Sequence, residues 1–449
     1  RDPRFLQEKT RKTRLQKSQL PMASSGRVSR NTSMSSRSND GKNSRVVFPK
    51  IPDGQWMAVR IFLGVGICFG SFQAPWQALP VLIDSKIAAD DGIPLTEKQM
   101  VLAQTAVYVG WFGGSFLLHP LMQRLDMRQL LVLMAGTMVL LSVGTVTLPY
   151  IQVLSLTMLC MVRLLHGICL NIQGLQIVHI TNTFPSRGSQ LCCVTNGLYS
   201  AVAAMMSLIC GSLTLETDWR LEALLWFGLP MSIGLLLAFP DLWSILKSLP
   251  SALTSKVTVV TSLEDGGKKQ GVSLPREMHK DLVNLAVCFA ATVYAYYGLS
   301  YSAHSLSSNP YGTSILLHGS DVVAYILASN TQWDRNRSQF GGFLLCGICL
   351  IACAAGASQP LFVLTMAMVA RMSLSVVFVT IYIALAELFP EWCQKIALPV
   401  CEIFGRAGGC LSPWCGSLPC HRSLPLFGLA CLVAARATSK LPNTARKNI

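Results

Sequence analysis

Charged and aromatic side chains interrupt long apolar runs at a few positions of this chain. Arg163 and Arg406 each lie within a run that is otherwise almost free of charge, and Tyr294, Tyr297 and Tyr301 follow one another at spacings of three and four residues. In a helix, this spacing places the tyrosines on one face. An arginine in an apolar helix is costly to bury, so we expect it to face the protein interior or a water-filled cavity. Such residues can bind an anion, or a cation through the aromatic rings.

The composition indicates which elements carry these side chains. Of the 449 residues, 51% are hydrophobic and 13% are charged, whereas soluble proteins carry about 25% charged residues. Apolar stretches long enough to cross a bilayer lie at 56–79, 102–122, 129–149, 152–174, 190–213, 221–240, 283–303, 312–329, 340–358, 360–388 and 396–414, with a shorter one at 424–435. We therefore expect an all-α membrane protein with twelve transmembrane helices, the last of them short.

The longest hydrophilic interruption separates the sixth span from the seventh, which predicts two six-helix halves related by an axis along the membrane normal. The expected organisation is a disordered basic cytosolic tail at 1–52, an N-terminal half at 53–240, a central cytosolic loop at 241–282, a C-terminal half at 283–436 and a cytosolic tail at 437–449. Lys and Arg gather in the segments that share a side with both termini, so the positive-inside rule places both termini in the cytosol. We expect a multi-pass protein of the plasma membrane rather than of an organelle. Met22 is a candidate for the native start.

Charge and cysteine usage argue against several other classes. The net charge of +15 comes mostly from the tail at 1–52, where 13 Lys or Arg face three acids, so we expect no nucleic-acid partner. Most of the 16 Cys lie inside apolar runs, where cysteine behaves as a small hydrophobe. We predict no metal site and no cofactor. The sequence contains no recognisable set of catalytic residues, which argues against an enzyme. The expected surroundings of the chain are the lipid bilayer.

Two polar loops occupy equivalent places in the two predicted halves. They read HPLMQRLDMR at 119–128 and DRNR at 334–337, and they resemble the signature loop of the major facilitator superfamily. The resemblance implies a cytosolic latch formed by Asp334, Arg335 and Arg337 in the second half and by Arg124 and Arg128 in the first. Gln123 replaces the acid of the first loop, and the alternative role is anchoring by positive charge alone. Arg163, with Gly167, resembles the second motif of this superfamily, which implies a structural role.

Three stretches of the second half narrow the resemblance. Residues 296–311 (YYGLSYSAHSLSSNPY), Asp321 with Tyr325, and YIALAELFP at 382–390 resemble the span-7, span-8 and span-10 patterns of the organic-ion transporters, which comprise organic cation, carnitine and organic anion transporters. Glu387 belongs to the last pattern, but Gln394 stands where that family has an arginine. The connection between the first two spans is shorter than in the family. The resemblance covers about 56–444.

The resemblance implies a central cavity lined by spans 1, 4, 7 and 10, helped by 2, 5, 8 and 11. The substrate-binding candidates are the polar and aromatic residues of these spans: Gln73, Trp76, Asn171, Gln173, Tyr294, Tyr297, Tyr301 and Arg406. At the position of Arg406, the family tends to have an acid in cation transporters and an arginine in anion and carnitine transporters. This favours an anion or a zwitterion such as carnitine. The alternatives are an intrahelical pair of Arg406 with Glu402 and an interfacial belt of tyrosines.

The main hypothesis is therefore a secondary-active transporter of small organic ions that works by alternating access. Its driving force is expected to be a coupling ion, H⁺ or Na⁺, or an exchanged anion. A sugar or polyol porter of the same superfamily is the nearest alternative. A non-transporting membrane scaffold or receptor is a third hypothesis, from a different class.

Overall fold

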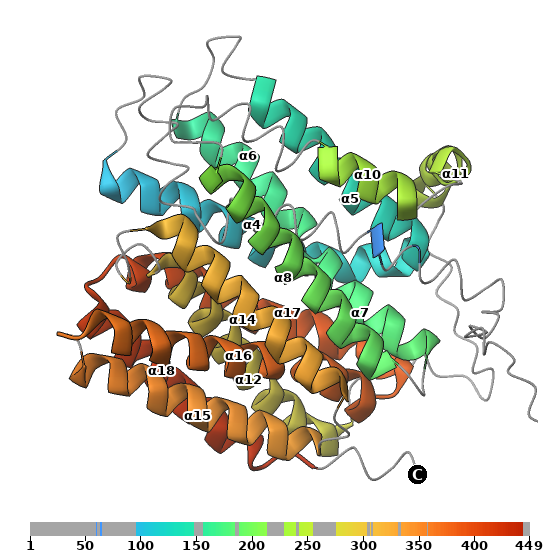
Figure 1. The fold of residues 1–449 in the computed structure, drawn as a ribbon. Helices are drawn as coiled ribbons and strands as arrows, with labels where there is room; N and C mark the ends of the chain where they lie inside the picture. The colour runs from blue at the N-terminus through green and yellow to red at the C-terminus, as the bar shows by residue number, and fades with distance from the viewer. Residues whose placement is uncertain are drawn as a thin grey trace, which may run out of the picture. The chain divides into compact units, whose positions relative to one another are not determined.

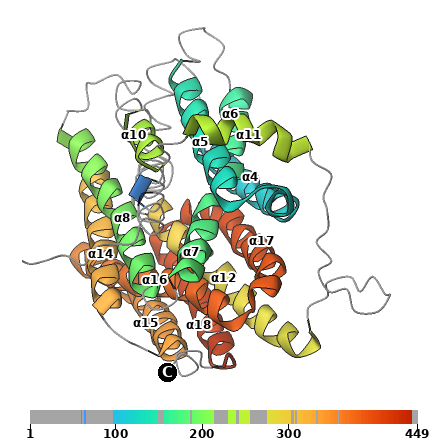
Figure 2. The ribbon, with the colours of Figure 1, turned by 90° about the vertical axis from the view of Figure 1, so that its right-hand side faces the viewer.

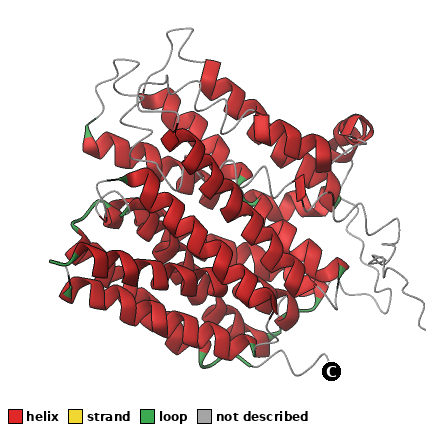
Figure 3. Cartoon of the chain, in the orientation of Figure 1, coloured by secondary structure: helices red, strands yellow, loops and turns green. Residues whose placement is uncertain are grey.

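Apolar runs form helices throughout the described part of the chain. The computed structural model describes residues 96–147, 156–184, 188–212, 229–238, 242–254, 275–302, 309–330, 334–356 and 358–442, with the single positions 60, 63, 64 and 306. Within these ranges the chain consists of helices and short loops, and no strand is present (Figure 3). The prediction of an all-helical protein is confirmed.

The helices follow the predicted spans closely. Those before the central loop are α4 (Glu97–Arg124), α5 (Met127–Thr147), α6 (Leu156–Cys169), α7 (Ile172–Thr183), α8 (Gly188–Ser212) and α10 (Leu229–Ala238). Those after it are α12 (Arg276–Tyr301), α14 (Pro310–Asn330), α15 (Arg335–Ala355), α16 (Pro360–Leu388), α17 (Glu391–Gly416) and α18 (Cys420–Thr438). In the described part, six helices are long and apolar enough to cross a membrane: Lys98–Met122, Leu156–Val178, Gly188–Ile209, Met278–Tyr301, Arg335–Ala355 and Pro360–Leu388.

Polar residues at the ends of the apolar runs fix where helices begin. Thr96 caps α4 in a reciprocal capping box with Gln99, which satisfies backbone N–H groups that have no partner within the helix. Asp334 caps α15 by accepting hydrogen bonds from the backbone N–H groups of Asn336 and Arg337. Pro360 occupies the first turn of α16, where a missing N–H costs nothing.

Helices from distant parts of the sequence pack side by side within the unit Ile51–Ile449. The most extensive contacts are those of α12 with α17, α8 with α14, α15 with α18 and α4 with α6 (Figures 1 and 2). Glycine permits the closest of these approaches. A Cβ at Gly110 would overlap the carbonyl oxygen of Leu164, and a Cβ at Gly167 would overlap that of Val107. These two glycines therefore allow the backbones of α4 and α6 to touch.

The structure differs from the predicted spans in three places. The fourth span is interrupted between α6 and α7, close to Asn171. The predicted central loop contains a helix, α11 (Leu242–Thr254), whose Ile245 is buried. The last span is 19 residues long rather than about 12, because α18 begins four residues before the apolar run, at Cys420, and continues three residues past it, to Thr438, which is fully buried. The division into two six-helix halves and the domain boundaries stay predictions.

Candidate functional site

A small polar pocket lies where α7, α8, α12, α14 and α16 meet. Its lining consists of amides, hydroxyls and aromatic rings: Gln173, Asn196, Tyr199, Ser200, Tyr296, Tyr297, Tyr325 and Phe378. Two of these residues connect the pocket to buried charges. Tyr296 contacts an ion pair between α14 and α16, and Tyr297 contacts the aromatic ring that covers a second ion pair in α17.

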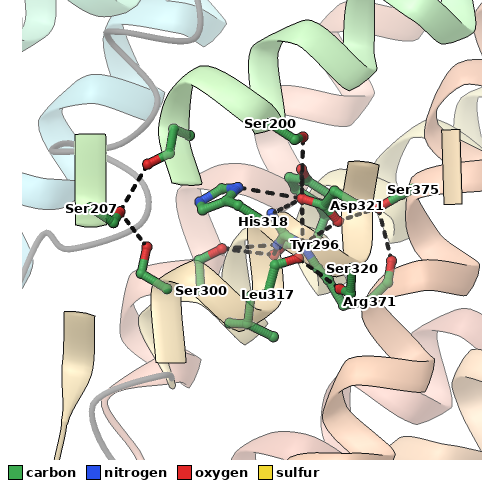
Figure 4. A network of polar contacts seen from close by, with 12 residues as sticks. Ser200, Ser207, Tyr296, Ser300, Leu317, His318, Ser320, Asp321, Arg371 and Ser375 are labelled. Atoms are coloured by element: carbon green, nitrogen blue, oxygen red, sulfur yellow. Dashed lines mark hydrogen bonds and ion pairs between the residues drawn. The ribbon is translucent and has the colours of Figure 1, made fainter. Parts of the chain in front are cut away.

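The first ion pair joins Asp321 of α14 to Arg371 of α16, and both side chains are fully buried (Figure 4). The Nε of Arg371 lies 2.9 Å from Oδ1 of Asp321, and its Nη2 lies 3.0 Å from Oδ2, so the contact is bidentate. The Tyr296 hydroxyl donates to the same carboxylate at 2.9 Å, and the Ser375 hydroxyl donates to it as well. Ser200 of α8 completes the set at 3.5 Å. Hydrogen bonds of this number compensate the cost of burying the carboxylate.

Arg371 also uses its third nitrogen. Nη1 donates to the Tyr296 carbonyl at 2.7 Å and to the Ser300 hydroxyl at 2.9 Å. The guanidinium carbon lies 3.3 Å from the centre of the Tyr296 ring, a cation–π contact. His318, one turn before Asp321, places Nδ1 at 3.4 Å from Oδ2 of the carboxylate. The cluster therefore connects α8, α12, α14 and α16.

The second ion pair joins Arg406 to Glu402, one turn apart in α17, and both are buried. The Tyr382 hydroxyl lies between the two charges: it donates to Oε1 of Glu402 at 2.7 Å and accepts from Nη2 of Arg406 at 3.1 Å. Trp111 of α4 covers the guanidinium, with 3.5 Å from its carbon to the ring centre. The predicted alternative, an intrahelical pair of Arg406 with Glu402, is thus present in the structure.

Two nitrogens of Arg406 are not used by this arrangement. Nε and Nη1 are buried, and neither has a hydrogen-bond partner among the described residues. A buried donor without a partner costs free energy, and a guanidinium binds a carboxylate best through two parallel N–H groups. Arg406 therefore combines a fixed positive charge with donors that remain available to an acceptor.

Three further aromatic rings group with Trp111, which covers this arginine. Tyr108 and Trp111 come from α4, and Tyr297 and Tyr301 from α12. The ring centres of Tyr108 and Tyr297 lie 5.4 Å apart, and those of Trp111 and Tyr297 lie 5.8 Å apart. Tyr301 completes the group at 6.1 Å from Tyr108. Such a group presents polarisable faces beside the charge of Arg406.

The structure brings together some of the predicted substrate-binding residues and separates others. Gln173 lines the polar pocket and donates to Asn196 at 3.3 Å. Asn171 does not line it. Its amide donates to the carbonyls of Trp111 and Ile168, and its oxygen accepts from Ser115 at 2.9 Å. These bonds engage both ends of the amide where α6 ends, so Asn171 connects α6 to α4.

Tyr294 also lies apart from the other two predicted tyrosines. Its ring packs edge-on against Phe427 of α18, with 4.8 Å between ring centres, whereas Tyr297 and Tyr301 turn towards α4. Gln73 and Trp76 lie outside the described residues. Of the eight predicted binding residues, Gln173, Tyr297, Tyr301 and Arg406 thus lie at the pocket or at the aromatic group beside it.

The predicted latch residues lie at the end of α4 and at the starts of α5 and α15, and Glu387 lies near the end of α16. Arg335 bridges to Glu387 at 3.6 Å, so Glu387 has a partner that the sequence pattern does not supply. Arg337 contacts Asp334 at 3.6 Å but leaves 84% of its side chain exposed. Arg124 is exposed in the last turn of α4, whereas Arg163 is buried in α6. Nothing is described for the side chain of Arg128.

Gln394 takes a different role from the arginine expected at its position. Its amide donates to the carbonyls of Ala386 and Phe389, both at 2.9 Å, and its oxygen accepts from Asn182 at 3.0 Å. The last contact links α17 to α7.

The sequence pattern singles out Asp321, but it does not predict the pairing of Asp321 with Arg371. The two residues are 50 positions apart, and no spacing rule pairs them. Opposite charges in two apolar helices were the available signal, because each charge needs a partner inside a membrane. Trp111 and His318 gave no such signal, since aromatic residues and a lone histidine are common in helix interiors. Tyr382 opens the span-10 pattern, but the pattern does not predict its contact with Arg406.

A larger cavity, of about 720 Å³, lies elsewhere, between α14, α15 and α16. Its walls are mostly apolar, and Leu327 and Leu345 on its rim are half exposed. Such residues face lipid in a membrane protein. This cavity contains neither buried ion pair, so we do not assign the site to it.

Comparisons with known proteins agree with the predicted family. No protein-family model matches the chain. The chain is 30% identical over 180 residues to solute carrier family 22 member 15 of Xenopus tropicalis, which covers 37% of this chain and 33% of that protein. It is 25% identical over 273 residues to the organic cation transporter protein of Drosophila melanogaster, covering 51% of this chain and 49% of that one. The human solute carrier family 22 member 13 matches 155 residues at 30% identity. The matched region spans half or less of each relative.

Solved structures identify the fold over a larger share of the chain. The crystal structure of the human organic anion transporter MFSD10 has a TM-score of 0.61 at 16% identity, covering 86% of this chain and all of that one. The proton:xylose symporter XylE, a major facilitator superfamily protein, has a TM-score of 0.69 at 15% identity, covering 87% of this chain and 96% of that one. The prediction of an all-helical membrane protein with the major facilitator fold is confirmed.

Proposed function

We propose that the chain is an organic-ion transporter of the major facilitator superfamily and that it moves small organic ions across a membrane. The expected mechanism is alternating access, in which helices rearrange around a central site. The relatives that it matches are named as solute carriers or transporters, which also supports a protein that is not an enzyme. We further propose that an anion or a zwitterion is preferred over a cation.

Arg406 is the observation that carries the charge preference. It is fully buried, and two of its nitrogens have no hydrogen-bond partner among the described residues. A cation at this position would meet a fixed positive charge, whereas a carboxylate would satisfy both donors. A hydrogen bond to a charged group contributes about 1.5–3 kcal/mol. This range corresponds to roughly a tenfold to 150-fold gain in affinity.

The partner of Arg406 extends the proposal to zwitterions. Glu402 places a negative charge beside the arginine, and Trp111 and Tyr297 supply aromatic faces close by. A substrate with a carboxylate and a quaternary ammonium group would meet a cation for the first group and aromatic rings for the second. Carnitine has this chemistry.

The proposed substrate path lies along the pocket. Gln173 and Asn196 face it from α7 and α8, and Tyr296 and Tyr297 face it from α12. The pocket is small in this arrangement of the helices, so binding of an organic ion requires them to separate. We propose that they separate along the contact of α8 with α14. Two hydrogen bonds would break there: that of Ser200 with Asp321, at 3.5 Å, and that of Ser207 with Ser314, at 2.9 Å.

The loop residues are proposed to hold the closed arrangement at one end of the helices. Arg335 with Glu387 connects α15 to α16, and Asn182 with Gln394 connects α7 to α17. These bonds would break and re-form during each cycle. We propose that this end faces the cytosol, together with both termini, and that the membrane is the plasma membrane.

One observation favours a sugar or polyol instead. The pocket is lined by amides and hydroxyls, which suit a ligand that offers hydroxyl groups without charge. In that case, both ion pairs would be structural.

Uptake into proteoliposomes tests these proposals. The panel contains a labelled aromatic carboxylate, labelled carnitine, a labelled tetraalkylammonium and labelled glucose, each at a range of concentrations. We expect saturable uptake of the first two, reduced at least tenfold by Arg406→Gln and less by Arg406→Lys. Uptake of the tetraalkylammonium alone would contradict the charge preference, and uptake of glucose alone would support the sugar porter. Failure of the folded protein to take up any of them would support a scaffold or receptor.

A further inference from the structure

His318 lies inside the helix bundle, next to a carboxylate. It exposes 2% of its surface, and its Nδ1 is 3.4 Å from Oδ2 of Asp321 (Figure 4). The substrate site proposed above does not use this histidine. Histidine is the side chain whose ordinary titration falls between about pH 5 and 8, so a buried one beside a carboxylate can take up and release a proton during a cycle.

The charged side chains around His318 sum to zero when His318 itself is neutral. Asp321 and Tyr325 lie on the same helix, α14; Tyr296 comes from α12 and Arg371 from α16. The element that packs most extensively on α14, which is α8, supplies the hydroxyl of Ser200 to the carboxylate. The Asp321–Arg371 pair carries no net charge, so the described cluster is neutral while His318 is neutral. A proton on His318 would give it one positive charge.

The cluster adjoins the pocket through shared residues. Tyr296 and Ser200 both line the pocket, and both donate hydrogen bonds to Asp321. The Arg406–Glu402 pair also carries no net charge, so an organic anion bound to Arg406 leaves one net negative charge in a site shielded from water, where an uncompensated charge is costly. Asp321 lies between His318 and the pocket residues Tyr296 and Ser200. Protonation of His318 therefore supplies the compensating positive charge next to the pocket.

We propose that His318 binds the proton that accompanies the substrate, so that the chain couples one proton to each organic anion. The inference rests on the proposed function, because it requires that the substrate be an anion. It assigns the coupling ion, and it makes two observable claims. Uptake of a monovalent anion rises when the outside is more acidic than the inside, and it is insensitive to the membrane potential, because a proton and a monovalent anion together carry no charge.

The experiment uses proteoliposomes that contain the full chain and labelled hippurate, an aromatic carboxylate. Initial uptake is compared at about pH 6 outside and pH 7.5 inside with uptake at pH 7.5 on both sides, after subtraction of protein-free liposomes. We expect at least a threefold rise with the proton gradient, acidification of the lumen reported by a trapped dye, and no effect of a potassium–valinomycin potential. Uptake that is independent of pH and driven by the potential would overturn the inference.

Two variants separate a proton site from a structural histidine. In His318→Gln, we expect the ratio of uptake with and without the gradient to fall to about one and a dependence on potential to appear. His166→Gln is the matched control, because His166 is equally buried but lies on α6, 3.1 Å from the Val162 carbonyl of its own helix; we expect it to keep the wild-type ratio. An unchanged ratio in His318→Gln would overturn the inference.

Exchange of labelled for unlabelled hippurate at equal pH distinguishes a failure of the His318 inference from a failure of the proposed transport function. Exchange without any effect of a proton gradient would leave the proposed function in place and remove the role of His318. Absence of both exchange and uptake by folded protein would remove the proposed function, and the inference with it.

Discussion

Replacing Asp321 with asparagine is expected to destabilise the folded protein by about 3–5 kcal/mol, the range for a buried ion pair that loses one partner. In the native structure, the carboxylate accepts two short bonds from Arg371, at 2.9 and 3.0 Å, and one from Tyr296 at 2.9 Å. Asparagine keeps the shape of the aspartate side chain but replaces one carboxylate oxygen, an acceptor, by an NH₂ group, a donor. It also leaves the fully buried guanidinium of Arg371 without a counter-charge. The loss should therefore approach the upper part of this range.

The measurement is the free energy of unfolding of the purified protein, from an equilibrium SDS titration followed by circular dichroism. A double variant, Asp321→Leu with Arg371→Met, removes both charges and should be at least about 2 kcal/mol more stable than Asp321→Asn, since replacing a whole buried pair by apolar residues is often neutral or stabilising. Arg337→Gln is the control for an exposed pair: its side chain is 84% exposed, and such pairs contribute about 0–1 kcal/mol. Equal losses for Asp321→Asn and Arg337→Gln would refute the reasoning.

Three further outcomes follow from the packing. Gly167→Val should prevent folding of most of the protein, because even a Cβ at this position would overlap the backbone of α4; a normal monodisperse peak in size-exclusion chromatography would contradict this. Tyr382→Phe removes the hydroxyl that bridges the Arg406 pair and should weaken anion binding about fivefold to tenfold, for a hydrogen bond of roughly 1 kcal/mol; unchanged inhibition constants would contradict it. Cys346 and Cys431 are buried, with sulfurs 3.5 Å apart, and should resist maleimide until SDS is added, so rapid labelling of the native protein would be the contrary result.

The sequence predicts the helices well because a bilayer imposes one length and one composition on every span. It also predicts the contact of Arg406 with Glu402, since residues four apart share a helix face. The predicted last span is shorter than α18 because the helix extends beyond the apolar run at both ends. It begins at Cys420, and it includes Arg436 before it ends at Thr438.

The sequence does not predict which side chains of distant helices contact one another. Nothing in the spacing of Asp321 and Arg371 indicates that α14 and α16 place them together. Asn171 was predicted to bind substrate because a polar side chain in a span is costly, yet the structure satisfies that cost through the backbone of α4. The free-energy cost of burying a polar side chain identifies the residues that need a partner. It does not say whether the partner is a substrate or a neighbouring helix.

Binding of an organic anion to the purified protein, measured by isothermal titration calorimetry with hippurate, tests most directly whether Arg406 forms an anion site. The decisive variant is Glu402→Gln with Arg406→Gln, because it removes both charges of the pair and leaves no buried charge without a partner. We predict that the wild type binds hippurate, that Glu402→Gln alone still binds it, and that the double variant binds it at least tenfold more weakly. Equal affinity of the double variant and the wild type would contradict the account.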